Sequence, residues 1–237
     1  MTFSIVARDP HSGALGVATA TAGPAVGALV VHGHAQTGAI ATQAMTNPLY
    51  GEQGLALLKE RYDAAAALKK ILQNDADADR RQVLIVDSQG NTAQWSGGAC
   101  GIWAGSLTGR QCVVGGNLLT GGETLEAMLK TYDERDSLPF TDRLLAAMNA
   151  GAEAGGDRRG LKSAALKIWD DRQYASVDLR ADWSDAPLQM LADILQQTRA
   201  PAHADFLPRC PKGDQADEIT LPRIPPDCVR GSSTAGY

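Results

Sequence analysis

The pattern of apolar and polar positions predicts a β-strand that begins at Thr2. Apolar side chains alternate from Phe3 to Ala7, and a period of two is typical of strands. A turn follows over residues 9–13, and a small apolar run over residues 14–21 is expected to pair back as a hairpin. We predict that residues 2–8 form a central, buried strand.

The remaining pattern groups strands with strands and helices with helices. Further strands are predicted over residues 25–32, 36–43, 82–86, 92–95, 111–114, 163–169 and 176–180. Helices are predicted in two pieces over 52–73, with Asp63 as an N-cap, then around 125–132, 139–154 and 186–197. The glycine-rich stretch 97–109 is expected to be irregular. This order favours an α+β fold with sheet stacked on sheet and helices outside.

Length and composition point to one large domain. The chain has 237 residues, of which 44% are hydrophobic and 21% charged, as in ordinary globular proteins. We expect a domain over residues 1–199 and a proline-rich tail over residues 200–237. The tail is expected to pack on the surface or to reach a neighbouring subunit, in a homo-oligomer of two or more copies.

Charge and cysteine spacing narrow the partners. The net charge is −5 and the isoelectric point is near 5.3, which argues against nucleic acid and an anionic membrane surface. No apolar run approaches the roughly 20 residues needed to span a bilayer, and no signal peptide is visible. The four cysteines lack metal-binding spacing and suit the reducing cytoplasm, where we expect the protein to be.

Thr2 is a candidate nucleophile because it directly follows the initiator. Removal of Met1 would leave Thr2 with a free α-amine beside its own hydroxyl. A terminal amine, with a pKa of roughly 7.7–8 in model peptides, can take the hydroxyl proton, so one residue can supply nucleophile and base. The alternative is that Thr2 simply starts a strand.

Other polar positions carry weaker signals. Asn117, in a glycine-rich turn, has an amide that can donate to a developing oxyanion; the alternative is that it serves only a tight turn. The run from Asp157 to Arg159 suits either a solvated helix end or a substrate carboxylate. His32 and His34 have the spacing of a metal pair, but the sequence offers few further ligands. We expect no metal and no cofactor.

Five phrases in one order resemble a bacterial family of unassigned function that is placed among N-terminal-nucleophile (Ntn) hydrolase-like proteins. They span residues 2–195 and read TFSIVARDP, ATQAMTNPLYG, CGIWAG, GGNLLTG and GGDRRG followed two residues later by SA. The resemblance implies a four-layer αββα sandwich of two stacked, mainly antiparallel sheets.

The resemblance also implies roles for individual residues. Matched by motif, Thr2 is the nucleophile, Gln43 and Ala44 precede the helix that binds the oxyanion, and Asn117 and Asp157 complete the catalytic group. The further substrate contacts that we expect are Arg8, His34, Asn47, Arg158 and Arg159. Such enzymes often carry a Lys or Arg at the start of the third or fourth strand, where this chain has no Lys.

The resulting hypothesis is an Ntn-type amidohydrolase that cleaves a C–N bond, amide or ureido, in a small polar substrate. The alternative is a non-catalytic ligand-binding or assembly protein on the same fold. Metal-dependent hydrolysis through His32 and His34 is a third, weaker alternative.

Overall fold

A computed structural model describes residues 2–156 and 159–213, which form two antiparallel sheets packed face to face. The larger sheet has the order β10-β9-β2-β1-β8-β7, built from β1 (Thr2–Arg8), β2 (Leu15–Thr21), β7 (Ala104–Gly109), β8 (Cys112–Asn117), β9 (Ser163–Trp169) and β10 (Val177–Ala181). The smaller sheet has the order β3-β4-β5-β6, built from β3 (Val31–His34), β4 (Gly38–Ala44), β5 (Arg81–Asp87) and β6 (Thr92–Ser96).

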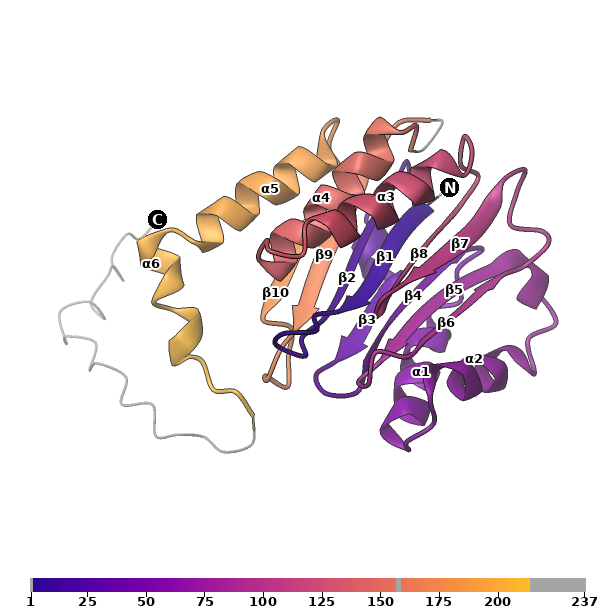
Figure 1. The fold of residues 1–237 in the computed structure, drawn as a ribbon, viewed down its shortest axis with the longest axis horizontal. Coiled ribbons are helices and arrows are strands. Elements are labelled where there is room, and N and C mark those ends of the chain that lie inside the picture. The colour runs from indigo at the N-terminus through magenta and orange to yellow at the C-terminus, as the bar shows by residue number, and fades with distance from the viewer. Residues whose placement is uncertain (1, 157–158, 214–237) are drawn as a thin grey trace, which may run out of the picture.

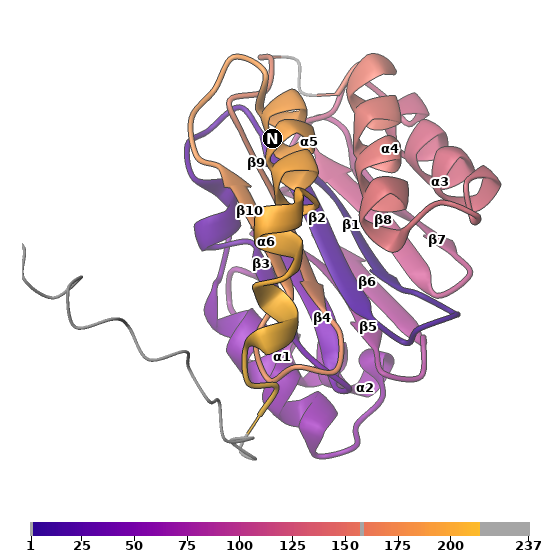
Figure 2. The same ribbon diagram turned by 90° about the vertical axis from the view of Figure 1, so that its left-hand side faces the viewer.

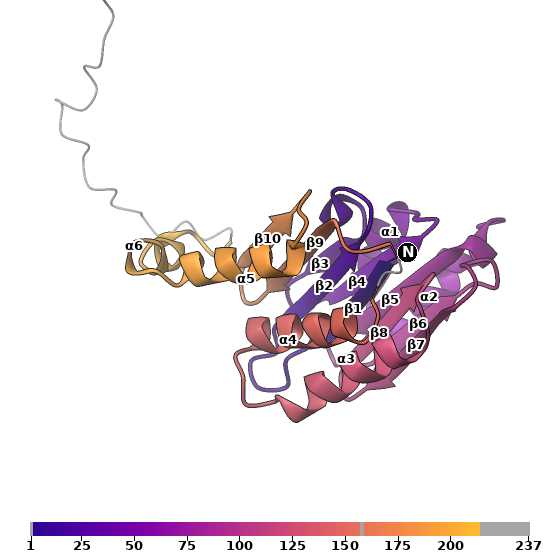
Figure 3. The ribbon, with the colours of Figure 1, turned by 90° about the horizontal axis from the view of Figure 1, so that it is seen from above.

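Helices cover the outer face of each sheet, so the layers run helix, sheet, sheet, helix (Figure 1). The larger sheet is covered by α3 (Glu123–Glu134), α4 (Phe140–Glu153) and α5 (Pro187–Thr198), which Figure 3 shows from above. The smaller sheet is covered by α1 (Leu49–Lys59) and α2 (Ala64–Leu72). Short 3-10 turns are η1 (Val26–Ala28), η2 (Ala78–Arg80) and η3 (Leu207–Arg209). The prediction of two stacked antiparallel sheets with helices outside is confirmed.

Strand β1 lies in the middle of the larger sheet, as predicted. It pairs with β2 on one side and with β8 on the other. Phe3, Ile5 and Ala7 are fully buried against the helices α3 and α4, whereas Val6 faces the second sheet and packs there against Leu84 and its neighbours. The alternation that predicted the strand is therefore the alternation between two cores.

Most elements predicted before residue 200 are present, with two main differences. Residues 25–32 form η1 and the short β3 rather than one strand, and the stretch 97–109 contains β7. Asp63 caps α2 as predicted, since its side chain accepts a hydrogen bond from the backbone N–H of Ala66. β7 was missed because its glycines give no side-chain period, and its pairing with β8 creates the strand.

After α5 the chain continues into the short helix α6 (Pro201–Ala204), which Figure 2 shows following α5. Proline suits the first turn of a helix, so Pro201 starts this element, whereas the sequence predicted no regular structure there. Among the residues that the structure describes, no helix combines the length and hydropathy that a membrane crossing requires.

Candidate functional site

The space between the two sheets is polar at the end where β1 begins. Small hydroxyl and amide side chains gather there, and every one of them is buried. This polar end consists of Thr2, Ser4, Thr19, Thr21, Gln43, Gln82 and Asn117.

Strand register places Thr2 in a row of polar side chains. Thr2 lies opposite Thr21 of β2 and opposite Asn117 of β8, and residues directly opposite one another share a face of the sheet. The Thr2 hydroxyl donates to Thr21 Oγ1 at 3.2 Å, and the residue is 8% exposed. The first residue of the strand is therefore nearly buried but lies at the mouth of the layer.

A chain of amide hydrogen bonds joins the two sheets behind this row. Ser4 Oγ donates to Gln43 Oε1 at 2.6 Å, and Gln43 Nε2 donates to Gln82 Oε1 at 2.8 Å. The same Gln82 oxygen accepts from Asn117 Nδ2 at 2.9 Å, while Gln82 Nε2 donates to the Gly116 carbonyl at 2.9 Å. The Gln82 amide accepts at its oxygen and donates at its nitrogen, so it cannot turn over without losing both sets of hydrogen bonds. Its oxygen is therefore a fixed acceptor that orients the Asn117 amide.

A cavity of about 270 Å³ opens beside Asn117. Because Asn117 is the register partner of Thr2, the cavity wall is one strand away from Thr2, roughly 5 Å between Cα atoms. The lining residues come from four separate loops and strand ends: Ala44, Met45, Arg80, Ala99, Cys100, Gly101, Asn117 and Leu118.

Two of the lining residues have left-handed backbone conformations without being glycine. Ala44 has φ 67° and Leu118 has φ 55°, immediately at or after the ends of β4 and β8. Such conformations cost on the order of 1 kcal/mol or more for an ordinary side chain and gather at functional sites. Here they turn both strand ends around the same cavity.

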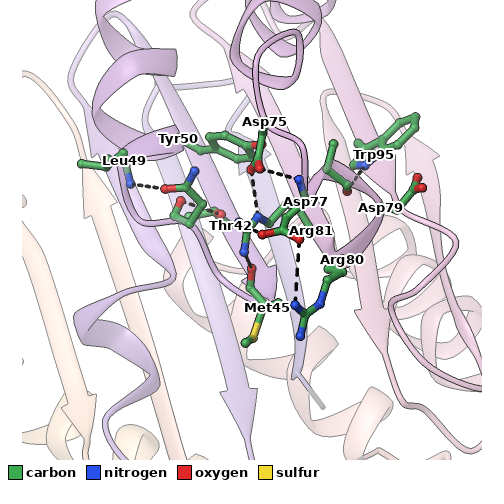
Figure 4. A network of polar contacts seen from close by, with 12 residues as sticks. Thr42, Met45, Leu49, Tyr50, Asp75, Asp77, Asp79, Arg80, Arg81 and Trp95 are labelled. Carbon is green, nitrogen blue, oxygen red and sulfur yellow. Dashed lines mark hydrogen bonds and ion pairs between the residues drawn. The ribbon is translucent and has the colours of Figure 1, made fainter.

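The loop that follows Ala44 is held by a partly buried ion pair between the start of β5 and the segment after α2 (Figure 4). Arg81 Nη1 donates to the Met45 carbonyl at 2.6 Å and Arg81 Nε donates to Asp75 Oδ2 at 2.9 Å. The Tyr50 hydroxyl also donates to Asp75 Oδ2, at 2.5 Å. Hydrogen bonds from Arg81 and Tyr50 hold the pKa of the Asp75 carboxyl well below its usual range, and burial raises the pKa of Tyr50.

The chain matches, over residues 2–191, the model of a family described as a family of unknown function (DUF1028). The chain belongs to this family. A crystal structure of a family member from Silicibacter pomeroyi is 33% identical, covers 89% of this chain and 92% of its own, and superposes with a TM-score of 0.84. The predicted resemblance to a family of unassigned function is thereby confirmed.

A more distant protein of known structure also aligns with most of the chain. Anbu (ancestral beta-subunit) from Yersinia bercovieri aligns over 88% of this chain and 98% of its own at 11% identity, but its TM-score of 0.37 is too low to carry an argument. No curated protein matches the chain.

The structure brings Thr2, Gln43, Ala44 and Asn117 together at the polar end, but in different ways. Gln43 is fully buried in the amide chain rather than open to a ligand. Ala44 lines the cavity. Asn47 serves the turn into α1, since its carbonyl accepts from Thr42 Oγ1 and its side chain accepts from the backbone N–H of Leu49.

Two expected substrate contacts, Arg8 and His34, lie at the opposite end of the sandwich. Arg8 ends β1, roughly 20 Å from Thr2 at the rise of an extended strand, and donates to the Ser88 carbonyl and to Gln111 Oε1. His34 pairs with Gly38, at the end of β4 away from Ala44. Neither residue is part of the site built around Thr2.

The expected contacts after α4 are only partly placed. Asp157 and Arg158 lie outside the described residues. Arg159 is exposed in the segment that leads from α4 to β9. Their convergence with Thr2 therefore stays a prediction.

The histidine pair and the cavity cysteine take ordinary structural places. His32 packs against α1 at Gly51 with its Nε2 at 3.0 Å from the Leu29 carbonyl, and burial lowers its pKa. Within the described ranges, no group of three or more His, Cys, Asp or Glu side chains is arranged to hold a metal. Burial raises the pKa of the Cys100 thiol, which donates to the Arg81 carbonyl at 3.1 Å, so its nucleophilic thiolate form is disfavoured.

Sequence reasoning missed three residues of this region. Gln82 was predicted only as the start of a buried strand, and Arg80 and Arg81 were given no role. The available signal was a glutamine in front of an otherwise apolar run, because a buried amide must find partners. No signal in the sequence distinguishes Arg81, which is partly buried in an ion pair, from Arg80, which lines the cavity.

Proposed function

We propose that the protein is an N-terminal-nucleophile amidohydrolase that cleaves an amide or ureido C–N bond in a small substrate. The observation that carries the proposal is the position of Thr2, the first residue of the central strand, in register with Asn117 at the wall of a cavity. Removal of Met1 would free the α-amine of Thr2 beside its hydroxyl. The Ntn-hydrolase-like resemblance of the sequence motifs points to the same residue.

The reaction would proceed in two steps. The Thr2 oxygen attacks the substrate carbonyl carbon while the α-amine takes the hydroxyl proton, which gives a tetrahedral oxyanion. The C–N bond then breaks, the leaving nitrogen takes that proton, and an ester to Thr2 remains. Water attacks the ester with the amine again as base, and Thr2 is released.

Asn117 is suited to stabilise the oxyanion. Its Nδ2 already donates one hydrogen to Gln82 Oε1 at 2.9 Å, which leaves the second hydrogen of the amide for the substrate. Donors that are oriented before the reaction lose no reorganisation energy during it. The amide chain through Gln82 supplies that orientation.

A binding protein without chemistry is the second candidate. The observation that favours it is the placement of Arg8, an expected substrate contact, at the far end of β1, where it cannot contribute a positive charge near Thr2. Such a protein would use the same cavity and would not require removal of Met1.

The test is a screen of small amides and ureido compounds with three proteins side by side: wild type, Thr2→Ala and a form that retains Met1. Wild type should turn over a substrate that Thr2→Ala leaves intact, and retention of Met1 should lower the rate about 10²–10⁴-fold through loss of the base. Thr2→Ser should keep part of the activity. Mass spectrometry of the native N-terminus accompanies the screen.

Thr19→Val is a matched control. Thr19 lies on the same face of β2 as Thr21, and its hydroxyl is hydrogen-bonded to Ser4 rather than to Thr2. This variant should keep turnover within a few-fold of wild type. The rate should also fall below a pH near the amine pKa of roughly 7.7–8. Equal turnover by wild type, Thr2→Ala and the Met1-retaining form would reduce Thr2 to the first residue of a strand.

A further inference from the structure

Of the described residues that line the cavity at the polar end, one, Arg80, is positively charged, and the rim is apolar. We infer that this cavity is the binding site for the carboxylate of a small amide substrate that also has a short apolar group, with Arg80 as the anchor of the carboxylate. This inference rests on the proposed function, because it names the substrate class of the same site. It assigns the carboxylate to a different element from the segment after α4 that the sequence indicated.

The backbone of Arg80 is held by hydrogen bonds, whereas its guanidinium makes a distant ion pair. Its backbone N–H donates to the Asp77 carbonyl at 2.8 Å, and its carbonyl accepts from the backbone N–H of Met45 at 3.0 Å. The side chain is 51% exposed, and its ion pair among the described residues is a 3.9 Å approach to Asp77. An exposed pair at that distance contributes little, so a ligand carboxylate can displace it.

The neighbouring Arg81, in contrast, has its guanidinium occupied by hydrogen bonds. Arg81 is 14% exposed and donates to both Asp75 and the Met45 carbonyl. It holds the loop that forms one wall of the cavity. Arg80 comes from the same turn and makes no such side-chain hydrogen bonds within the described part of the chain, and Figure 4 shows it on the side of the network away from Tyr50.

The rim of the cavity is apolar and open. Met45 is 53% exposed and Leu118 is 40% exposed, both as lining residues. Ile102, next to the lining residue Gly101, is 90% exposed. Large exposed apolar side chains gathered around a polar cavity mark a binding site, and here they favour a ligand with an aliphatic part.

Size and chemistry then define the substrate class. A cavity of about 270 Å³ lies just below the range of ordinary ligand sites, roughly 300 to 1,000 Å³, so the ligand is small. The guanidinium of Arg offers two parallel donors that match a carboxylate, and the Asn117 amide lies on the wall nearest Thr2. A carboxylate held at Arg80 would direct a nearby C–N bond toward Thr2, as in a short N-acyl amino acid.

The experiment measures binding with chemistry blocked. Thr2→Ala protein, shown by mass to lack Met1, is titrated by calorimetry with N-acetylglycine, N-acetyl-L-alanine and N-acetyl-L-leucine, and with the matching neutral carboxamides. We expect each acid to bind roughly tenfold or more tightly than its carboxamide, as hydrogen bonds to charged groups contribute. The leucine compound should bind best because it reaches the apolar rim.

Arg80→Gln in the same background should remove the preference for the acid and leave binding of the carboxamides unchanged. Arg80→Lys should restore part of the preference. Arg61→Gln is the matched control, because Arg61 lines a cavity at the other end of the molecule. It should change nothing.

The inference is overturned if acids and carboxamides bind equally, if the preference persists in Arg80→Gln, or if no acid of the series binds. Its fate is separable from that of the proposed function. A preference that depends on Arg80, without any Thr2-dependent turnover by wild type, keeps the site and rejects the hydrolase. Thr2-dependent turnover of neutral amides, with KM unchanged in Arg80→Gln, keeps the hydrolase and rejects the carboxylate site.

Discussion

The layer between the two sheets is filled with polar side chains at one end and with apolar side chains at the other, and the change takes place along single strands. On β1 the inward positions read Thr2, Ser4, Val6, and on β5 they read Gln82, Leu84, Val86. The same change occurs on β2 and β4. Each strand thus contributes both to a hydrophobic core and to the polar end.

The comparison shows where burial stabilises the fold and where it serves a site. Apolar burial contributes about 25 cal/mol per Å², whereas a buried amide contributes little net free energy even when all its hydrogen bonds are made. A chain selected for stability alone would continue the apolar half to the end of the layer. The polar end is instead filled with amides and hydroxyls, and it adjoins a cavity and two left-handed residues, Ala44 and Leu118.

The largest loss of stability should come from the apolar half. Leu84→Ala removes a fully buried side chain that packs closely against Gly115, and such truncations cost about 2–5 kcal/mol. The free energy of unfolding in urea measures the loss. Leu107→Ala, on the exposed edge strand β7, should cost much less. Binding or turnover per folded molecule should not change in Leu84→Ala. If activity per folded molecule fell together with stability, the apolar half and the polar end would not have separate roles.

The next largest effect should come from the centre of the amide chain. Gln82→Leu keeps the volume but deprives the amides of Asn117 and Gln43 of their shared acceptor. Leaving buried donors without partners costs about 1–3 kcal/mol. Gln94→Leu, at an exposed position of the adjacent β6, should change stability by less than about 0.5 kcal/mol. Turnover should fall in Gln82→Leu because Asn117 is no longer oriented. A variant as stable and as active as wild type would show that the amide hydrogen bonds do not position Asn117.

A smaller effect, and one that depends on pH, should follow from Arg81→Met. Asp75 has a pKa held below its usual 3.8 by Arg81 and Tyr50, so its stabilisation is complete above the unfolded value and is lost as pH falls through the folded value. The stability difference between wild type and Arg81→Met, about 1–2 kcal/mol near pH 7, should therefore narrow below pH ~4.

Urea unfolding between pH 3 and pH 7 measures this difference. Arg180→Met, which breaks an exposed pair with Asp182, is the control and should change stability by under about 0.5 kcal/mol. A difference in Arg81→Met that stays constant over the whole range would mean that Asp75 is not the group responsible.

The sequence allowed the layers and the central strand to be predicted because their signals are local. Alternation identified β1, and Asp63 before a run of alanines identified a cap. The strand β7 could not be found, because Gly105 and Gly109 have no side chains to alternate and the pairing with β8 is a long-range event.

Of the residues at the polar end, the sequence pointed to Thr2, Gln43, Ala44 and Asn117, and the pair that carries the site is Thr2 and Asn117. Their meeting depends on register, which the motif order implied and the pairing now shows. Arg8 was expected to contact the substrate, although the rise of roughly 3.3 Å per residue places the end of β1 far from Thr2. Arg80 and Arg81 are adjacent and identical in type, so only the folded structure shows that Arg81 holds the loop and that Arg80 lines the cavity.

The smallest effect on stability should accompany the largest effect on function. Thr2→Val keeps the branched shape and removes only a hydroxyl, whose hydrogen bond to Thr21 is long, at 3.2 Å, and lies at the edge of the core. We expect the free energy of unfolding to change by less than about 1 kcal/mol, less than in Gln82→Leu, while turnover disappears because no nucleophile remains. Urea unfolding and the amide screen on the same preparation measure both quantities. If Thr2→Val instead unfolded as easily as Gln82→Leu and kept its turnover, Thr2 would belong to the structural polar network, and the reaction would have to use another residue.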